Sequence, residues 1–242
     1  MPDAARVGWL PQWEYAHRGL HNAAVPENSP AAFARAIRRG MGIECDVQQT
    51  RDGRAMVFHD WTLDRLTCET GPIAARDAAE LQMIALGGST ARIPTLESLL
   101  GQVAGQVPLL IEVKSKRESS PVPLCLAVRK ALDGYRGDVS VMSFDPRVPN
   151  WFHAHARGVV RGLVVTEENG RGAVGRWRRQ LTLWHAKPDF LAYDVRDLPN
   201  AFAIAQRKRG LPLLTWTVRS PDMRARAELH ADAPIAEGAG LA

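Results

Sequence analysis

The chain has 242 residues, of which 45% are hydrophobic and 24% charged, and its formal net charge at pH 7 is +5. This length and balance are typical of one globular domain and argue against a disordered protein. No stretch approaches the roughly 20 apolar residues of a membrane span, and the N-terminus lacks the apolar core of a secretory signal. We therefore expect a cytoplasmic protein without stable membrane insertion.

The cysteines and the basic residues argue against disulfide- or zinc-stabilised proteins and against nucleic-acid-binding proteins. Three scattered cysteines without paired spacing argue against a disulfide framework or a zinc cage. The positive charge comes mainly from arginines, which form no long stripe with interleaved aromatic residues. We therefore expect no nucleic-acid partner.

In the first part of the chain the pattern predicts a strand, a helix and a hairpin. A strand is expected at Tyr15–Ala16, just before a His-Arg-Gly sequence. Ser29 then caps a helix that Gly40 ends. Strict alternation predicts a strand over Ile43–Val47. The tight turn that follows makes residues 55–58 the second arm of a hairpin, because the gap is too short for a parallel crossover.

The rest of the chain returns to alternating strands and helices after an irregular stretch. Residues 61–107 are expected to hold two short helices, which are placed at 78–86 and 96–100. Later helices are expected around 124–132 and from Asp145. The remaining strands are expected at 108–114, 139–143, 162–165, 190–193, 213–217 and 233–236.

Without the second hairpin arm these strands number eight. The pattern therefore predicts an α/β protein, a (β/α)8 TIM barrel of one domain over residues 1–242, with an insertion after the second strand. A doubly wound open sheet is the alternative. It would need a glycine-rich turn after the first strand, which Gly19 alone does not provide. The last strand is short and no eighth helix follows it, so the closure of the barrel at its C-terminal strand is left open.

Three carboxylates follow the pattern of a metal site. Glu44 and Asp46 are two residues apart on one strand and therefore face the same side, and Glu112 lies on another apolar strand. The C-terminal ends of barrel strands meet at one mouth. Three acids there would form an oxygen-rich site that suits Mg2+ or Ca2+ better than zinc. The alternative is that each acid pairs with an arginine.

Two histidines come directly after predicted strands. His17 and His59 could take and donate a proton, since imidazole titrates near neutral pH. Arg18 and Lys114 supply fixed positive charge for a phosphate. The other five histidines have no comparable setting, and we expect surface or packing roles for them.

Nine short motifs then occur in order over residues 15–218. They are His17-Arg18-Gly19, Pro26-Glu27-Asn28-Ser29, Glu44-Cys45-Asp46-Val47, Asp52-Gly53, His59-Asp60, Ile93-Pro94-Thr95-Leu96-Glu97, Ile111-Glu112-Val113-Lys114, Ser143-Phe144 and Trp216-Thr217-Val218. In this order the chain resembles the glycerophosphodiester phosphodiesterase family, which belongs to the phosphatidylinositol-phospholipase-C-like TIM-barrel phosphodiesterases.

The resemblance implies a function and a role for each candidate residue. It implies metal-dependent hydrolysis of a small glycerophosphodiester to glycerol 3-phosphate and an alcohol, in a TIM barrel with an inserted subdomain at residues 60–108. It implies one divalent cation, Mg2+ or Ca2+, on Glu44, Asp46 and Glu112, and acid and base catalysis by His17 and His59. It also implies phosphate contacts from Arg18 and Lys114. Trp216 would be an aromatic residue of the substrate pocket, for which a position in the barrel core is the alternative. Alternative functions are a lysophospholipase D acting on single-chain lipids and a non-catalytic phosphate- or lipid-binding module.

Overall fold

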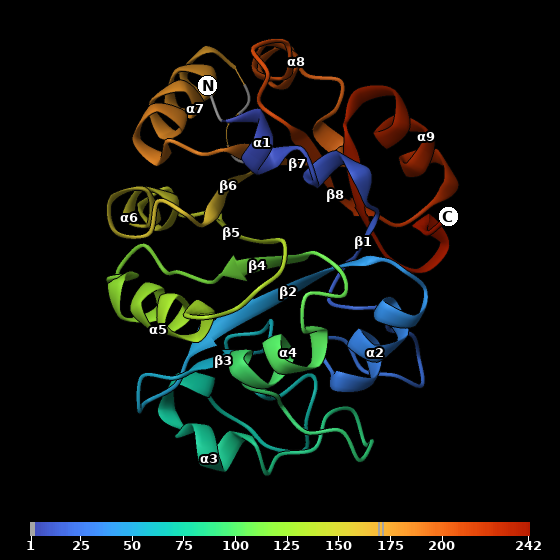
Figure 1. The fold of residues 1–242 in the computed structure, drawn as a ribbon, viewed down its shortest axis with the longest axis vertical. Helices are drawn as coiled ribbons and strands as arrows, with labels where there is room; N and C mark the ends of the chain where they lie inside the picture. The colour runs from blue at the N-terminus through green and yellow to red at the C-terminus, as the bar shows by residue number, and fades with distance from the viewer. Residues whose placement is uncertain (1–2, 169, 171) are drawn as a thin grey trace. The chain divides into compact units, whose positions relative to one another are not determined.

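The computed structural model describes residues 3–168, 170 and 172–242. Its strands follow the order β1-β9-β8-β7-β6-β5-β4-β2-β3, and β1 also pairs with β2. Eight strands thus form the ring of a (β/α)8 barrel, and β3 is the extra arm of the hairpin, as predicted. The chain divides into two compact units, one of Ala16–Val139 and one of Met1–Tyr15 with Ser140–Ala242. Helices α1 to α9 and strands β1 to β8 are labelled in Figure 1.

The unit Ala16–Val139 is built around the long strand β2. Its elements in chain order are β1 (Tyr15–Ala16), α2 (Pro30–Arg38), β2 (Gly42–Gln49), β3 (Ala55–Val57), η2 (Ile73–Ala75), α3 (Ala78–Leu81), α4 (Leu96–Val103), β4 (Leu109–Val113), α5 (Val122–Leu132) and the start of β5 (Val139–Ser143). Strand β2 pairs in parallel with β4 and antiparallel with β3. Helices α2, α4 and α5 lie beside these strands (Figure 1).

Local sequence explains the elements that support β2. Ser29 caps α2 by accepting a hydrogen bond from the backbone N–H of Ala32 at 3.2 Å, and Pro30 takes the first helical position. Seven of the eight residues of β2 are buried, as in a strand covered on both faces. The register with β4 sets Asp46 opposite Glu112.

The segment after β3 differs from its prediction in one helix. The helix expected at 78–86 is the single turn α3, because Ala85 and Arg92 form an antiparallel bridge across a tight turn. The second helix runs longer than expected and ends at Val103, where Ala104 adopts a left-handed conformation. The segment packs on the hairpin in one buried cluster, which consists of Met56, Phe58, Leu63, Ile73, Ala78, Leu81, Leu86 and Ile93.

The unit Met1–Tyr15 with Ser140–Ala242 holds the remaining parallel strands. Its elements are α1 (Ala4–Val7), η1 (Leu10–Gln12), the rest of β5, α6 (Arg147–His155), β6 (Val160–Val165), α7 (Ala173–Ala186), β7 (Phe190–Asp194), η3 (Val195–Asp197), α8 (Ala201–Lys208), β8 (Leu213–Val218), α9 (Pro221–His230), β9 (Ala233–Ala236) and η4 (Gly238–Gly240). Strands β5 to β9 pair in parallel in sequence order.

The closure that the sequence left open is complete. Strand β9 pairs in parallel with β8, and the strand order sets it beside β1. The short helix η4 follows β9 in place of a full helix, and the backbone carbonyl of Gly240 accepts a hydrogen bond from Arg224 Nε at 2.7 Å. The ring therefore needs no eighth long helix.

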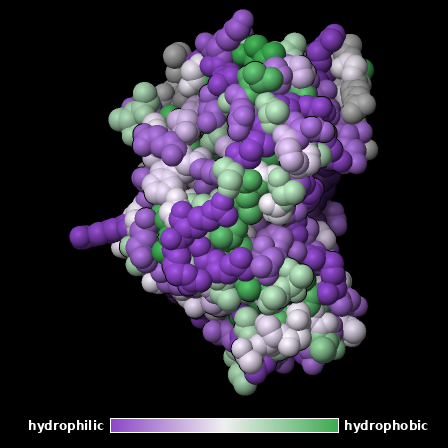
Figure 2. Space-filling model, turned by 90° about the vertical axis from the view of Figure 1, so that its right-hand side faces the viewer, coloured by the Kyte–Doolittle hydropathy of each residue, from purple (hydrophilic) through white to green (hydrophobic). Residues whose placement is uncertain are grey.

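The helices and one face of the surface were compared with what a membrane-spanning protein needs. Among the described residues, none of the helices has the length and hydropathy needed to cross a bilayer. On the face shown in Figure 2, hydrophilic residues predominate and the hydrophobic ones form small, separate spots.

Candidate active site

The three predicted acids form one cluster in the unit Ala16–Val139. Glu44 and Asp46 come from β2 and Glu112 comes from β4. Each offers a carboxylate oxygen, and these oxygens all lie within 4.8 Å of one another. All three residues are buried. The parallel register and the two-residue spacing on β2 together bring the acids to one place.

Two cations neutralise part of this charge. Lys114 Nζ lies 3.0 Å from Asp46 Oδ1 and 2.9 Å from Glu112 Oε1. Burial would lower the pKa of Lys114, but the two carboxylates raise it above its ordinary value, so the ammonium stays charged. Burial would likewise raise the pKa of Asp46, but Lys114 and Arg18 outweigh burial and hold that pKa well below its usual range.

The donor set fits a hard divalent cation. The pKa of Glu44 is raised well above its ordinary value, because the side chain is buried and lies near the charges of Asp46 and Glu112. A divalent cation among these oxygens would relieve that repulsion. Three carboxylates supply the hard oxygen ligands that Mg2+ and Ca2+ take, and among the described residues no histidine or cysteine belongs to the cluster.

The loop after β1 wraps around the two acids of β2. Arg18 and Asn28 both have positive φ, at 55° and 53°, which turns the backbone inward at each end of the loop. The Arg18 backbone N–H donates to Glu44 Oε2 at 2.9 Å. Asn28 Nδ2 donates to Asp46 Oδ2 at 3.0 Å. The acids are therefore fixed by groups that the loop presents to them.

His59 is held in place from two sides. Gln48 Nε2 donates to the backbone carbonyls of Phe58 at 3.1 Å and of His59 at 3.0 Å, which fixes the end of the hairpin. The Nδ1 atom of His59 lies 2.6 Å from Asp60 Oδ1. When Nδ1 carries the proton, the Nε2 atom is the one available to exchange a proton with a substrate.

Arg65 connects the two sides of the site. Its guanidinium donates to Asp60 Oδ2 at 2.5 Å and to Glu27 Oε1 at 2.7 Å. Glu27 Oε1 also accepts from Arg18 Nη1 at 2.7 Å. Hydrogen bonds from Arg65 and His59 lower the pKa of Asp60 to about 2 against the opposing effect of burial, so Asp60 stays ionised.

Sequence reasoning assigned no role to Asn28, Gln48 or Arg65. For Asn28 the sequence offers one indication, since it belongs to the Pro26-Glu27-Asn28-Ser29 motif directly before the helix that Ser29 caps. Gln48 and Arg65 carried none, because their partners lie 5 to 38 residues away along the chain and the contacts depend on the folded structure.

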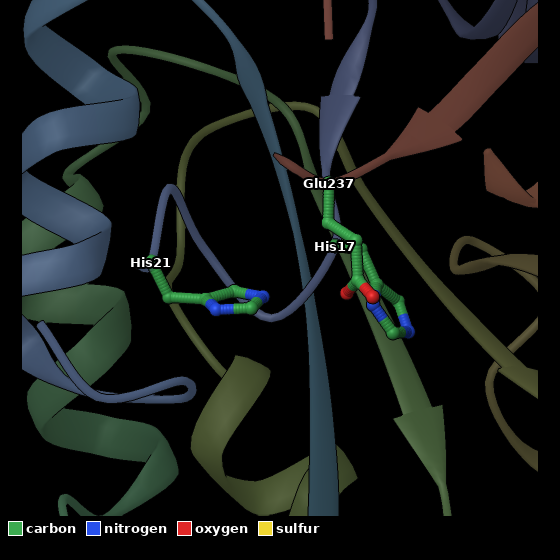
Figure 3. A group of neighbouring side chains, drawn as sticks. All are labelled: His17, His21 and Glu237. Atoms are coloured by element: carbon green, nitrogen blue, oxygen red, sulfur yellow. The ribbon is translucent and has the colours of Figure 1, made fainter. Parts of the chain in front are cut away.

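His17 lies in the loop after β1 and is 8% exposed. His21 comes from the same loop and its ring points toward His17 (Figure 3), so that one ring nitrogen of each histidine lies within 4.8 Å of the other. Glu237, drawn in the same figure, follows β9 in the other unit, where its Oε1 lies 2.5 Å from Arg219 Nε.

Cys45 points away from its acidic neighbours by strand alternation, and burial raises the pKa of its thiol, so it is a packing residue.

Trp216 lies on β8 in the second unit. Its Nε1 donates to the backbone carbonyl of Ala192 at 2.9 Å, and its ring packs edge-on against Phe144 with 5.3 Å between ring centroids. The ring of Phe144 is partly exposed, so the pair has an accessible edge. Its role in a substrate pocket stays a prediction.

Comparison with known proteins tests the resemblance. A profile of the glycerophosphoryl diester phosphodiesterase family matches residues 17–236. The YhdW protein of Bacillus subtilis is 28% identical over 222 residues, which cover 88% of each chain. Glycerophosphodiester phosphodiesterase 1 of Bos taurus is 46% identical over 254 residues, which cover 89% of this chain and 74% of the bovine protein.

The fold is shared with solved structures as well. A phosphodiesterase of Oleispira antarctica, in complex with the product sn-glycerol-3-phosphate, matches with a TM-score of 0.79 and 22% identity over 93% of this chain and 92% of its own. At this identity the likeness shows the barrel fold. The family profile, in contrast, covers both histidines and all three acids in one continuous match. The chain thus belongs to the glycerophosphoryl diester phosphodiesterase family, whose members hydrolyse phosphodiesters of glycerol.

Proposed function

We propose that this enzyme hydrolyses small glycerophosphodiesters to glycerol 3-phosphate and an alcohol, with one divalent cation held by Glu44, Asp46 and Glu112. The observation that carries the proposal is the cluster of three buried carboxylates whose oxygens lie within 4.8 Å of one another. The Oleispira structure, which holds sn-glycerol-3-phosphate, supports the expected product.

The proposed cation is Mg2+ or Ca2+, since both take carboxylate oxygens. When bound, it supplies positive charge next to the phosphate and stabilises the charge that develops there. Arg18 and Lys114 are proposed to add to this charge. The carboxylates that already surround both side chains keep them ionised and in place.

His17 and His59 are proposed as the acid–base pair. His59 is oriented through Nδ1 by Asp60, an arrangement that stabilises the imidazolium after it takes a proton. His17 approaches from the other loop of the same unit, the one that follows β1. Of the two, one takes the proton of the attacking hydroxyl and the other protonates the leaving alcohol.

The attacking group can be the glycerol 2-hydroxyl or a water molecule. The 2-hydroxyl would displace the alcohol and close a five-membered cyclic phosphate, which a water molecule would then open to glycerol 3-phosphate. Attack within one molecule avoids the entropy cost of fixing a second molecule. Both routes use the same two histidines. A substrate analogue without the 2-hydroxyl separates them: unchanged turnover of the analogue would show attack by water, and binding without turnover would show ring closure.

The inserted subdomain also stays a proposal. We place it at residues 60–108, and a buried cluster supports it, because six of the eight residues of that cluster come from this segment. Trp216 is proposed to line the substrate pocket through its accessible edge beside Phe144.

The deciding experiment combines metal removal with a substrate panel. Purified protein should lose its activity toward glycerophosphocholine and glycerophosphoethanolamine after exhaustive dialysis against a chelator, and regain it with Mg2+ or Ca2+. Calorimetric titration should show weaker metal binding in Glu44→Gln, while Glu97→Gln, an exposed acid that pairs with Arg54, serves as the matched control. Full activity after chelation would contradict the metal site. Activity confined to lysophospholipids would instead favour a lysophospholipase D.

A further inference from the structure

Helix α7 carries four exposed apolar side chains on one face. Val174, Trp177, Leu181 and Trp184 are 67%, 66%, 45% and 73% exposed. Their spacings of three, four and three residues follow the helical repeat, so they form one continuous stripe. Two tryptophans that are each about two-thirds or more exposed leave a large apolar area of this stripe in contact with water.

The opposite face of α7 already has its packing partners. Ala186 belongs to the core cluster that β6, β7 and β8 share with α8, and Leu183 packs against that cluster. Arg179 also points inward, where its Nη2 lies 3.1 Å from Glu167 Oε1. The exposed stripe therefore adds nothing to the core of this unit.

Basic residues flank the stripe on both sides. On a helical projection Arg178 and His185 border one edge and Arg176 lies beyond the other, while Lys187 comes directly after the end of the helix. All four are exposed, and residues 172–188 contain no acid. The neighbouring acids Glu167 and Asp189 are paired with arginines, and Glu168 is the nearest exposed acid along the chain.

The adjoining helix extends this positive surface. Helix α6 packs against α7, and the two lie next to each other in Figure 1. Residues 147–159 of α6 and its following turn contain no acid, and they add exposed His155 and Arg157.

We propose that the stripe of Val174, Trp177, Leu181 and Trp184 docks the enzyme on the surface of an anionic phospholipid bilayer. Tryptophan favours the boundary between headgroups and acyl chains. An amphipathic helix with basic flanks binds there through apolar burial and attraction to anionic headgroups. This is peripheral contact, independent of the catalytic roles proposed above.

The charges favour a membrane over the other possible occupants. A second copy of the same face would bring Arg176 and Arg178 of both chains together without an acid on the helix to pair with them. A nucleic acid would match the charge but not the aliphatic Val174 and Leu181. Anionic lipid satisfies both the charge and the apolar stripe.

Vesicle co-sedimentation of the full chain tests the proposal. The protein should bind vesicles of phosphatidylglycerol with phosphatidylcholine at low salt, bind phosphatidylcholine alone weakly, and dissociate at high salt. Tryptophan emission should shift to shorter wavelength on binding and be quenched by brominated lipid. Wild-type protein that stays in the supernatant with anionic vesicles at low salt overturns the proposal.

Variants distinguish binding through this stripe from non-specific adsorption through other exposed apolar residues. Trp177→Ser with Trp184→Ser should weaken vesicle binding by more than about tenfold, because both rings lose their apolar burial. Arg176→Gln with Arg178→Gln should weaken it by about 30-fold at low salt. Leu229→Ser, which removes another well-exposed apolar side chain on α9, should change nothing.

Two further results would reject the membrane as the occupant. The double tryptophan variant must keep its circular dichroism spectrum and its turnover of a water-soluble glycerophosphodiester, so that lost binding is not lost folding. Vesicle binding equal to wild type in that folded variant overturns the proposal. A wild-type dimer in light scattering that the variant converts to a monomer, without any vesicle binding by either, assigns the face to a second copy instead.

Discussion

His59 and Arg18 are held by one continuous chain of charged hydrogen bonds. It runs from His59 to Asp60, from Asp60 to Arg65, from Arg65 to Glu27 and from Glu27 to Arg18. Each link is a charge-assisted bond of 2.5–2.7 Å. The chain joins a proposed proton-transfer group to a proposed phosphate ligand through residues that need not touch the substrate.

Removal of either proposed proton-transfer group should cost the reaction most of its rate. We expect His17→Ala and His59→Ala each to lower kcat by ~10²–10⁴-fold, the usual loss when a positioned acid or base is removed. His153→Ala and His155→Ala, both on α6, are the matched controls and should change kcat little. Small and equal effects at all four positions would show that His17 and His59 are structural.

Arg65 should act as a positioning residue. In Arg65→Gln the Asp60 carboxylate loses its guanidinium, so we expect its pKa to rise and kcat to fall by about tenfold. The acidic limb of the kcat profile should move to higher pH, and Arg65→Lys should restore part of the rate. Arg54→Gln, which removes an exposed ion pair with Glu97, is the control. An unchanged pH profile in Arg65→Gln would mean that Arg65 has no such role.

At the level of elements, the sequence predicted what depends on periodicity and local capping. Alternation over Ile43–Val47 located β2 and the side on which its acids lie, and Ser29 located the start of α2. Helix α3 was predicted too long, since the bridge between Ala85 and Arg92 depends on a tertiary turn that no local pattern encodes. The contacts of Gln48 and Arg65 were out of reach for the same reason.

The pairing of β6 with β7 predicts the effect of a small substitution. Gly162 lies opposite Phe190, and a Cβ at Gly162 would lie 2.3 Å from the Phe190 ring. Gly162→Ala should therefore lower the free energy of unfolding by about 1–3 kcal/mol through overpacking. Gly101→Ala on α4, where a Cβ meets nothing within 4 Å, should instead raise it by up to about 1 kcal/mol. Urea denaturation of both variants and of the wild type checks this prediction. A Gly162→Ala variant as stable as the wild type would show that the Phe190 ring moves aside freely.

For the whole molecule, the sequence predicted the ring of eight strands because each parallel strand carries its own apolar run. The proposed metal ligands and proton-transfer groups all come from residues 17–114, within the single unit Ala16–Val139. The closure at β9 could not be predicted, since η4 and the Arg224 contact replace a helix by interactions that leave no periodic signal.

Stability at alkaline pH should depend on Tyr193. Burial and the hydrogen bond to Glu167 raise the pKa of this phenol above its ordinary value. The folded chain therefore keeps a proton that the unfolded chain releases above about pH 10, so this stability is present below about pH 10 and is lost as the pH rises further. Tyr193→Phe should show a shallower fall in unfolding free energy with pH over that range. A slope equal to that of wild type would contradict this account.

The contact of Arg65 with Glu27 limits which parts of the protein can be exchanged between relatives. A chimera that receives residues 61–108 from another protein without an equivalent of Arg65 would leave two carboxylates, Glu27 and Asp60, without their shared partner. We therefore expect the loop after β1 and the segment after β3 to vary together among relatives, so that substitutions that reshape one persist only where the other has changed to match it.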